Sequence, residues 1–455
     1  MVLPTMRTHV ASLFVVGLLA CTASRTSAPE PAAAAHEGAP LPFIEDDYAR
    51  AVSEAQAKGV PLFVDTWAPW CHTCRSMRAY VFTDPALARH AGRFVWLALN
   101  TDLPSNAVFQ EKYPLEFWPT FFIIDPRQGK ALVRFAGSAT VAQLEKIFED
   151  GEHAYRGDAQ GAEAALARGD ALYGANKPAE AAEAFAQALA EAPPSWSRQG
   201  RTLESLLTAQ FSAKQYEPCA RKVLEQLPLM PRSPSMANAL TIAIGCAAGM
   251  PQDTPQRKEL LASLDAKGRE ALAPPPIEMP ADDRSGLYEA MVEGRAEQGD
   301  EAGSKALAAE WLTFLEGEAA KAPNPEARTV FDSHRMGAAM VLGDPMRVVP
   351  AIEQSERDLP DDYNPPARLA NLYRMLGRLD DALAANDRAL ARVQGARRLR
   401  VFSDRSAIQV ARGEKAAAVK TLEEAITYAK SLSEAQASKR QVEALEKKLT
   451  ELKAK

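Results

Sequence analysis

The feature that most constrains this chain is a pair of cysteines, Cys71 and Cys74, placed directly after an apolar segment from Val60 to Trp67. The apolar segment predicts a buried β-strand, and the cysteine pair opens a segment of helical composition. At a helix start, unpaired backbone N–H groups and the helix dipole stabilise a thiolate on the first cysteine. The second cysteine, one turn further along, can then reach the first. The arrangement therefore indicates a redox-active pair.

A cysteine pair at this spacing can also be half of a zinc site. However, the sequence around it contains no second Cys pair and no Cys/His pair at ligand spacing. The spacing therefore favours redox chemistry, and we expect neither a bound metal nor a prosthetic group.

Further landmarks follow in order along the chain. Tryptophans at positions 67 and 70 flank the first cysteine, Tyr80–Pro85 reads YVFTDP, and Lys112–Thr120 ends in Trp-Pro-Thr. With the cysteine pair, these segments resemble a thioredoxin-fold domain, closest to the periplasmic C-terminal domain of DsbD-type thiol:disulfide interchange proteins. The resemblance implies an α/β fold with a central mixed sheet flanked by helices, in a domain that we place at residues 43–152.

The resemblance also implies roles for residues near the cysteines. Pro119 aligns with the cis-proline of the family, although trans is the commoner form of an X-Pro bond. Trp70 and Trp118 would border the groove that binds substrate. Simple packing is the alternative for Trp118.

Asp65 falls where thioredoxins keep a buried carboxylate under the active site, so the resemblance implies that it accepts a proton from Cys74. The alternative is an exposed strand residue. Many thioredoxins keep a lysine near this carboxylate, where this sequence has Ala98. Without that cation, we expect burial to raise the pKa of Asp65 further.

The residues between the cysteines, His72 and Thr73, influence the redox potential. A cationic His72 would stabilise the Cys71 thiolate and make the disulfide more oxidising, by roughly 30 mV per pKa unit. In strong oxidants of this fold the histidine directly precedes the second cysteine, a position that Thr73 takes here, so His72 alone does not indicate an oxidase. A solvated loop residue is the alternative for His72.

The mechanism that the resemblance implies is thiol–disulfide exchange on protein substrates, in which Cys71 attacks and Cys74 resolves the mixed disulfide. Regeneration of the reduced pair would require a membrane electron donor of the DsbD or CcdA type.

The N-terminus predicts export. Arg7 and His9 precede an apolar run, Val10 to Ala20, which is too short to span a bilayer, so residues 1–20 are expected to be a signal peptide. The run ends in Leu-Leu-Ala before Cys21, which resembles the lipobox of bacterial lipoproteins. Residues 21–42 are rich in Ala and Pro and predict a flexible linker. We therefore expect a lipid anchor on Cys21, at a membrane facing the periplasm; secretion with cleavage near Ala23 is the alternative.

Beyond about Tyr155 the sequence changes to Ala-rich helical segments with a period near 34 residues, the length of a tetratricopeptide (TPR) repeat. Gly343 and Gly377 lie 34 positions apart, and Gly413 follows at a similar interval. We expect an all-α TPR-like solenoid over residues 153–455, degenerate between positions 203 and 320, interrupted by a Pro-rich break near position 274, and closed by a capping helix from Ser433 to Lys455. Such arrays bind proteins or extended peptides; a structural spacer is the alternative.

Composition excludes some functions. A formal charge of −6 leaves no basic surplus for phosphates, so no nucleic-acid partner is expected. The sequence therefore predicts a membrane-anchored thiol:disulfide oxidoreductase, expected to be a reductase that acts on protein disulfides through Cys71 and Cys74, with a TPR array that recruits protein partners. The alternative is a TPR scaffold or chaperone-like protein whose thioredoxin domain is a redox-gated binding module.

The remaining two cysteines, Cys219 and Cys246, lie in consecutive predicted helices, Tyr216–Gln226 and Pro234–Ala248. In an antiparallel hairpin both would lie at the same end, within disulfide reach. We expect a structural disulfide here; two unrelated buried thiols are the alternative.

Overall fold

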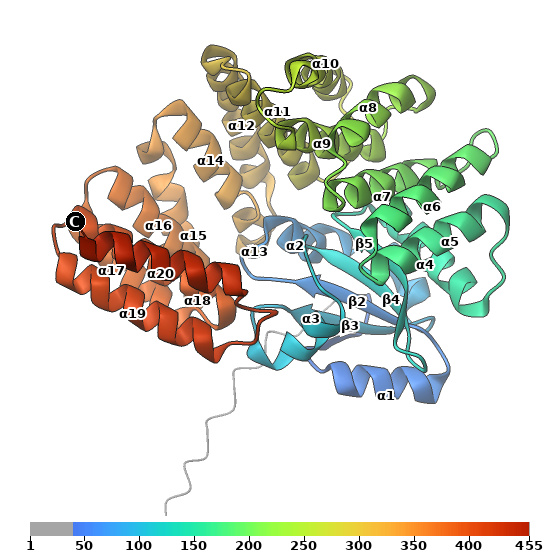
Figure 1. Cartoon of the computed structure of the whole chain (residues 1–455), viewed down its shortest axis with the longest axis horizontal. Coiled ribbons are helices and arrows are strands. Elements are labelled where there is room, and N and C mark those ends of the chain that lie inside the picture. Colours follow the sequence, from blue (N-terminus) through green and yellow to red (C-terminus); the bar gives the residue numbers. More distant parts are fainter. Residues whose placement is uncertain (1–39, 455) are drawn as a thin grey trace, which may run out of the picture. The chain divides into compact units, whose positions relative to one another are not determined.

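The computed structural model describes residues 40–454. An N-terminal α/β region built on a five-stranded sheet is followed by a long all-helical region (Figure 1). The predicted signal peptide, Cys21 and most of the predicted linker lie outside the described residues. Among the helices of the described part, none is long and apolar enough to span a bilayer.

The sheet is mixed, in the order β1-β3-β2-β4-β5. Strand β3 is parallel to β1 and β2, whereas β4 is antiparallel to β2 and β5. The central strands are buried on both faces, which explains their continuous apolar sequences. The strands are β1 (Phe43–Glu45), β2 (Leu62–Trp67), β3 (Val95–Asn100), β4 (Thr120–Asp125) and β5 (Lys130–Ala136).

Helices cover both faces of this sheet. Helices α1 (Tyr48–Lys58) and α3 (Ala107–Lys112) bury apolar side chains against one face. The other face is covered by α4 (Val141–Arg156) and by the π-helical turn Met77–Val81, which continues α2 (His72–Ser76). This arrangement is the predicted α/β fold. Helix α4 continues to Arg156, so the domain boundary expected at residue 152 falls inside this helix.

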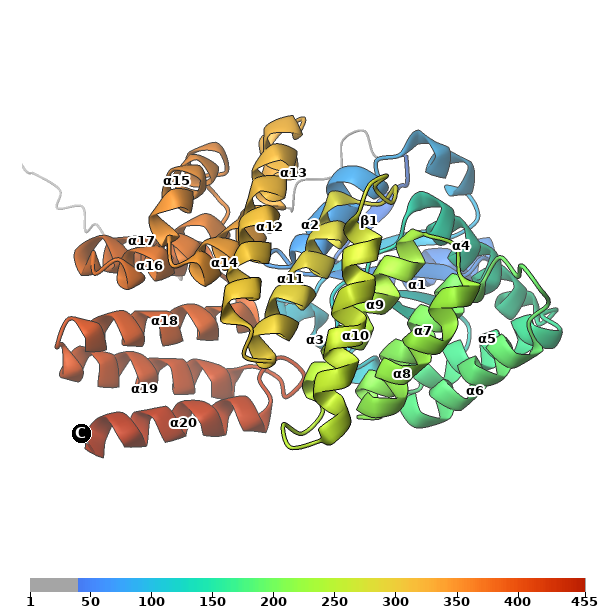
Figure 2. The same cartoon turned by 90° about the horizontal axis from the view of Figure 1, so that it is seen from above.

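The rest of the chain consists of helices that pack largely as consecutive pairs (Figure 2). Helix α8 has the predicted limits, and α9 extends one residue further than predicted. The helices are α5 (Gly161–Gly174), α6 (Pro178–Glu191), α7 (Gln199–Ser212), α8 (Tyr216–Gln226), α9 (Pro234–Gly249), α10 (Pro255–Leu272), α11 (Ala281–Glu297), α12 (Glu301–Lys321), α13 (Pro325–Thr329), α14 (Asp332–Leu342), α15 (Val349–Asp358), α16 (Asn364–Met375), α17 (Leu379–Arg392), α18 (Arg398–Ala411), α19 (Lys415–Ser431) and α20 (Lys439–Ala454).

The repeat glycines lie at equivalent turns. Gly343, Gly377 and Gly413 each follow a helix and have φ angles of 75°, 74° and 79°. This left-handed conformation favours glycine, and it lets the chain reverse into the next helix. The glycine spacing therefore reports the period of the helical pairs.

The helical region differs from prediction at the start of its capping helix. The capping helix begins at Lys439 and not near Ser433, because Ser438 caps it: the Ser438 side chain accepts from the Gln441 amide, and the Gln441 side chain accepts from the Ser438 amide. The Pro-rich break is the connection from Ala273 to Pro280, between α10 and α11. The helices before and after it pack in one apolar core.

Candidate redox active site

Cys71 and Cys74 form a disulfide at the start of α2, with Cα atoms 5.2 Å apart. Cys71 is the N-cap residue of α2, and its sulfur accepts a hydrogen bond from the Cys74 amide at 3.0 Å. In the reduced state the same amide and helix end would stabilise a thiolate on Cys71. Cys74 is fully buried, whereas Cys71 retains 4% exposure. The geometry thus makes Cys71 the accessible sulfur.

The segment opposite the disulfide ends in Trp118-Pro119, whose peptide bond is cis. The Pro119 carbonyl accepts from the Gly137 amide at 2.9 Å, at the point where β4 begins beside β5. Trp118 packs with Cys71 and Cys74, and its indole N–H donates to the Thr101 hydroxyl at 2.9 Å. Trp118 therefore borders the disulfide.

Asp65 lies in the middle of β2 and is 1% exposed. Burial raises the pKa of this carboxyl group to about 7, although the nearby Arg78 guanidinium opposes the shift and Glu45 adds to it. In register with Asp65 is Ala98 of β3, and beyond Ala98 is Glu45 of β1. The direction of the shift agrees with the expectation from Ala98. The sequence did not indicate that Arg78 supplies a cation from the π-helical turn.

His72 is not a solvated loop residue. It is the first residue of α2, and its Nδ1 atom lies 2.9 Å and 3.0 Å from the two carboxylate oxygens of Asp282 in α11. Burial would lower the pKa of His72, but the Asp282 carboxylate outweighs it and the pKa is raised. Burial would likewise raise the pKa of Asp282, but His72 reverses the direction and the pKa is lowered. The Thr73 hydroxyl lies 3.2 Å from the same His72 nitrogen.

Two further contacts join the cysteine motif to the helical region. The Arg75 guanidinium donates to Asp362 at 2.6 Å and to the Thr329 hydroxyl at 2.7 Å. The Asn364 amide group, at the start of α16, donates to the Pro69 carbonyl at 3.1 Å. The loop before the first cysteine is thus held by residues nearly 300 positions away.

Trp70 is part of this contact. Its indole N–H donates to Asp102 at 3.2 Å, and its ring packs with Trp118 at a centroid distance of 5.3 Å. The guanidinium of Arg397 lies 4.8 Å from the Trp70 ring centroid, a cation–π geometry. Trp70 therefore contacts both the α/β region and the C-terminal helices.

Two pockets lie beside neighbours of the cysteines in the sequence, and Trp118 lines both of them. The first has a volume of about 700 Å³ and lies between Trp70, Asp102 and the C-terminal helices near Arg397. The second has a volume of about 300 Å³ and lies beside His72 and Thr73, against helices α7, α9 and α11. Side chains of the helical region thus form one wall of each pocket.

Cys219 and Cys246 form a second disulfide, between α8 and α9, with Cα atoms 6.1 Å apart. Both residues are fully buried among the apolar side chains of the helical region. No residue of the cysteine motif belongs to that cluster, so this second disulfide lies in the core of the helical region and apart from the redox motif.

Sequence reasoning missed the residues that the helical region contributes to the site. These residues are Asp282, Thr329, His334, Asp362, Asn364 and Arg397. The repeat period predicts that helices stack, but it does not predict which helix meets the cysteine motif. The only local signal was the Asp282-Asp283 pair directly after the Pro-rich break.

Comparison with known proteins agrees with this geometry. Residues 44–126 match the thioredoxin-like family. The chain is 30% identical over 89 residues to the thiol:disulfide interchange protein DsbD of Pseudoalteromonas atlantica, covering 19% of this chain and 15% of that protein. It is 32% identical over 137 residues to the chloroplastic thioredoxin M4 of Arabidopsis thaliana, covering 29% and 61% of the two chains. This chain therefore contains a thioredoxin-like domain, and it spans less than two thirds of either relative.

Among solved structures, a tetratricopeptide repeat protein from Parabacteroides merdae aligns with this chain with a TM-score of 0.40 and 13% sequence identity, covering 64% of this chain and 98% of that one.

Proposed function

We propose that this protein is a membrane-anchored, extracytoplasmic thiol:disulfide oxidoreductase that reduces protein disulfides through Cys71 and Cys74. The observation that carries the proposal is the position of the Cys71 sulfur, at the N-cap of α2 and hydrogen-bonded to the Cys74 amide. Trp118, which precedes the cis bond to Pro119, packs against the cysteines, and the buried Asp65 is in the strand that leads into the motif.

The chemistry is a two-electron exchange. The Cys71 thiolate attacks a substrate disulfide, forming a mixed disulfide and releasing one substrate thiolate. Cys74 then loses its proton to Asp65 and attacks the Cys71 sulfur, which releases the second substrate thiolate and leaves the Cys71–Cys74 disulfide. Turnover requires a donor of two electrons, for which we propose a membrane protein of the DsbD or CcdA type.

The helical region has a binding role in this proposal. Its helices form a wall of both pockets beside the disulfide, so a protein substrate that reaches Cys71 also meets the repeats. The membrane anchor is proposed from the sequence, because the apolar run before Cys21 and the Ala/Pro-rich segment after it match a lipidated tether.

The test is covalent trapping with the Cys74→Ala variant. Loss of the resolving thiol leaves the mixed disulfide intact, so we expect substrate adducts that migrate slowly in non-reducing gels and disappear after reduction. The Cys71→Ser/Cys74→Ala double variant is the matched control and should form none. If the Cys74→Ala variant accumulates no adduct, just like the double variant, Cys71 is not the nucleophile.

The alternative is a redox-gated binding protein. It is favoured by the near-complete burial of Cys71 and by the contacts of Arg75 and Pro69 with the helical region. In this alternative, the oxidation state of the Cys71–Cys74 pair changes how tightly a partner binds, and the protein does not catalyse repeated reduction of disulfides. Steady-state reduction of a disulfide substrate by wild-type protein supports the enzyme, whereas partner binding that depends on redox state without turnover supports the gated protein.

A further inference from the structure

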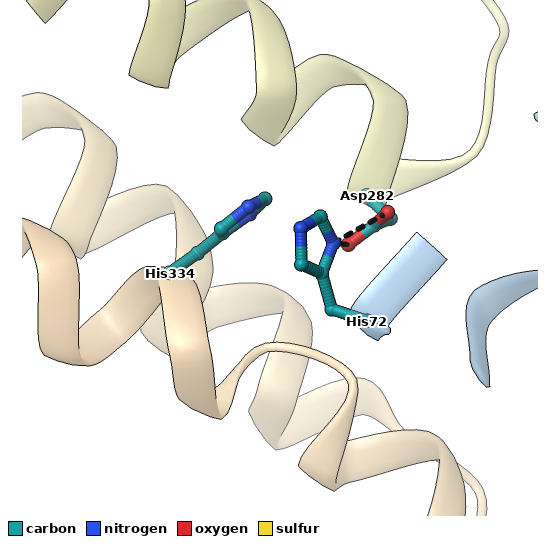
Figure 3. A group of neighbouring side chains, drawn as sticks. All are labelled: His72, Asp282 and His334. Carbon is teal, nitrogen blue, oxygen red and sulfur yellow. Dashed lines mark hydrogen bonds and ion pairs between the residues drawn. The ribbon is translucent and has the colours of Figure 1, made fainter. Parts of the chain in front are cut away.

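Three side chains that are remote in sequence meet beside the cysteine motif (Figure 3). His72 begins α2, Asp282 lies in the first turn of α11, and His334 lies in α14. One possible ligand atom from each lies within 4.8 Å of the others. Asp282 and His334 are 2% exposed, whereas the His72 side chain retains 29% exposure. The cluster is therefore buried but open on the His72 side.

Both imidazoles are held through their Nδ1 atoms. His72 Nδ1 contacts the Asp282 carboxylate, and His334 Nδ1 lies 2.5 Å from the Ser285 hydroxyl oxygen. Ser285 in turn accepts from the Trp311 indole at 2.7 Å, which fixes its position. The two rings lie with centroids 3.9 Å apart. A hydrogen on each Nδ1 leaves both Nε2 atoms free to offer a lone pair.

The Nε2 atom of His334 has no hydrogen-bond partner within residues 40–454, although it is buried. The nearest carboxylate oxygen belongs to Glu289, at 3.4 Å. Asp282, Ser285 and Glu289 are spaced three and four residues apart and therefore share one face of α11. This face thus presents an outer partner for each histidine and a further carboxylate, that of Glu289, 3.4 Å from the Nε2 atom of His334.

We propose that this cluster is a binding site for a divalent transition-metal ion of the zinc type. The ligands are Nε2 of His72, Nε2 of His334 and the carboxylate of Glu289, with Asp282 and Ser285 as the outer partners that orient the imidazoles. A metal-bound histidine normally donates its other N–H to a carboxylate or a similar acceptor. With Nδ1 protonated, His72 would donate to Asp282 and His334 to the Ser285 hydroxyl oxygen, which lie at hydrogen-bond distance. Nitrogen ligands favour zinc-type ions over magnesium or calcium.

A neighbouring pocket gives the ion a route into the site. His72 and Asp282 line the pocket of about 300 Å³, so an ion can enter from it. Tetrahedral zinc bonds of about 2.1 Å place ligand atoms roughly 3.4 Å apart. The Nε2 atom of His334 and a carboxylate oxygen of Glu289 already lie 3.4 Å apart. A bound ion would link the helix of the redox motif to α11 and α14. Binding does not require disulfide exchange, so the inference goes beyond the proposed function.

The experiment is zinc titration of the full chain by calorimetry, without an affinity tag and after removal of metal by chelation. Both disulfides are kept oxidised, because free thiols at Cys71 and Cys74 would bind zinc themselves. We expect one equivalent of zinc for the wild type and at least a tenfold weaker affinity for His334→Gln and for Glu289→Gln. Asp282→Asn should weaken binding by about 10- to 100-fold, as expected for an outer partner.

His153→Gln is the matched control, because His153 also pairs with an aspartate, Asp158, at 2.8 Å but is exposed. It should bind zinc like the wild type. If His334→Gln does not fold, as judged by circular dichroism, His72→Asn at the partly exposed position decides instead. Failure of the wild type to bind one equivalent, or equal affinity in the wild type and both histidine variants, overturns the site. Trapping by Cys74→Ala is independent of either result.

Discussion

Asp65 is a carboxyl group enclosed by a strand that is otherwise apolar, and one of its oxygens has no hydrogen-bond partner in the described chain. Its pKa is raised from 3.8 to about 7 in the folded protein. Between these values the unfolded chain loses the proton and the folded chain keeps it. Stability contributed by the neutral form is therefore present below pH 4 and is lost as pH rises toward 7.

The Asp65→Asn variant should lack this pH dependence. Relative to the variant, the wild type should lose stability by about 1.4 kcal/mol per pH unit between pH 4 and pH 7. Urea unfolding at pH 4.5 and pH 6.5 measures the difference. The variant should also resolve mixed disulfides about 100-fold more slowly, because it has no proton acceptor for Cys74.

The exposed Asp253 provides a control for this change, since Asp253→Asn should alter neither the pH dependence nor the rate. A wild type and an Asp65→Asn variant with parallel stability curves from pH 4 to pH 7 would show that Asp65 is ionised in the fold.

At the level of elements, a partly buried ion pair between Arg75 and Asp362 joins α2 to the residues just before α16. Burial would raise the pKa of Asp362, but the Arg75 guanidinium outweighs it and the pKa is lowered. The ion pair therefore adds stability at pH values above the ordinary aspartate range, and this contribution is lost as pH falls through the lowered pKa. Arg75 and Asp362 are each 14% exposed, so solvent screens the pair only in part.

We expect Asp362→Asn to loosen this contact by about 1–3 kcal/mol at pH 7, the range for hydrogen bonds to charged groups. Amide hydrogen exchange of the segment 68–76 should become faster, and dithiothreitol should reduce the Cys71–Cys74 disulfide sooner. The neighbouring Asp361 is exposed, and Asp361→Asn should change neither quantity. Unchanged exchange in Asp362→Asn would mean that the ion pair does not hold the motif.

The Cys219–Cys246 bond joins α8 to α9 and closes a loop with a sequence separation of 27 residues. Loop-closure arithmetic gives about 3 kcal/mol of stability for a bond of this span. The Cys219→Ala/Cys246→Ala double variant should therefore unfold at lower denaturant concentration, with unchanged trapping of substrate by Cys71. Peptide mapping of the oxidised wild type should find neither thiol free; alkylation of both would exclude the bond.

The sequence predicted individual elements well where local physics determines them. The apolar segment and the cysteine pair predicted β2 and α2, and the apolar period with its turn residues predicted α8 to the residue. Prediction was poorer at the end of α4 and the start of α20, because caps and not apolar periodicity decide where a helix starts or ends. The left-handed Gly157 ends α4, and the side chains of Ser438 and Gln441 cap the start of α20.

For the whole molecule, the repeat period predicted an all-helical array but not its contact with the redox motif. His72 illustrates this limit of local patterns. The sequence indicated either a residue that adjusts the redox potential of the cysteine pair or a solvated loop residue. Its partner Asp282 lies 210 positions away in a region where the repeats are degenerate. Such pairing depends on how all the intervening helices stack. No local pattern in the sequence carries that information.

The way the helices stack also bears on the role of the helical array in the proposed function. A spacer would leave the disulfide independent of the repeats, but here helices from the middle and the end of the array contact residues 69–75 and line both pockets. In the proposed function, a substrate that reaches the disulfide would therefore also contact the helices. We infer that the array takes part in substrate selection at the disulfide itself.

Membrane attachment is the last property of the whole chain that can be tested directly. If Cys21 is acylated, the wild type should partition into detergent and a Cys21→Ser variant into the aqueous phase. Thr22→Ala preserves the cysteine and should still partition into detergent. Mass spectrometry of the mature N-terminus gives the modification itself. A wild type that stays in the aqueous phase and begins near Ala23 would show plain secretion. The redox motif lies more than forty residues from Cys21 along the chain, so it should react equally with and without the lipid.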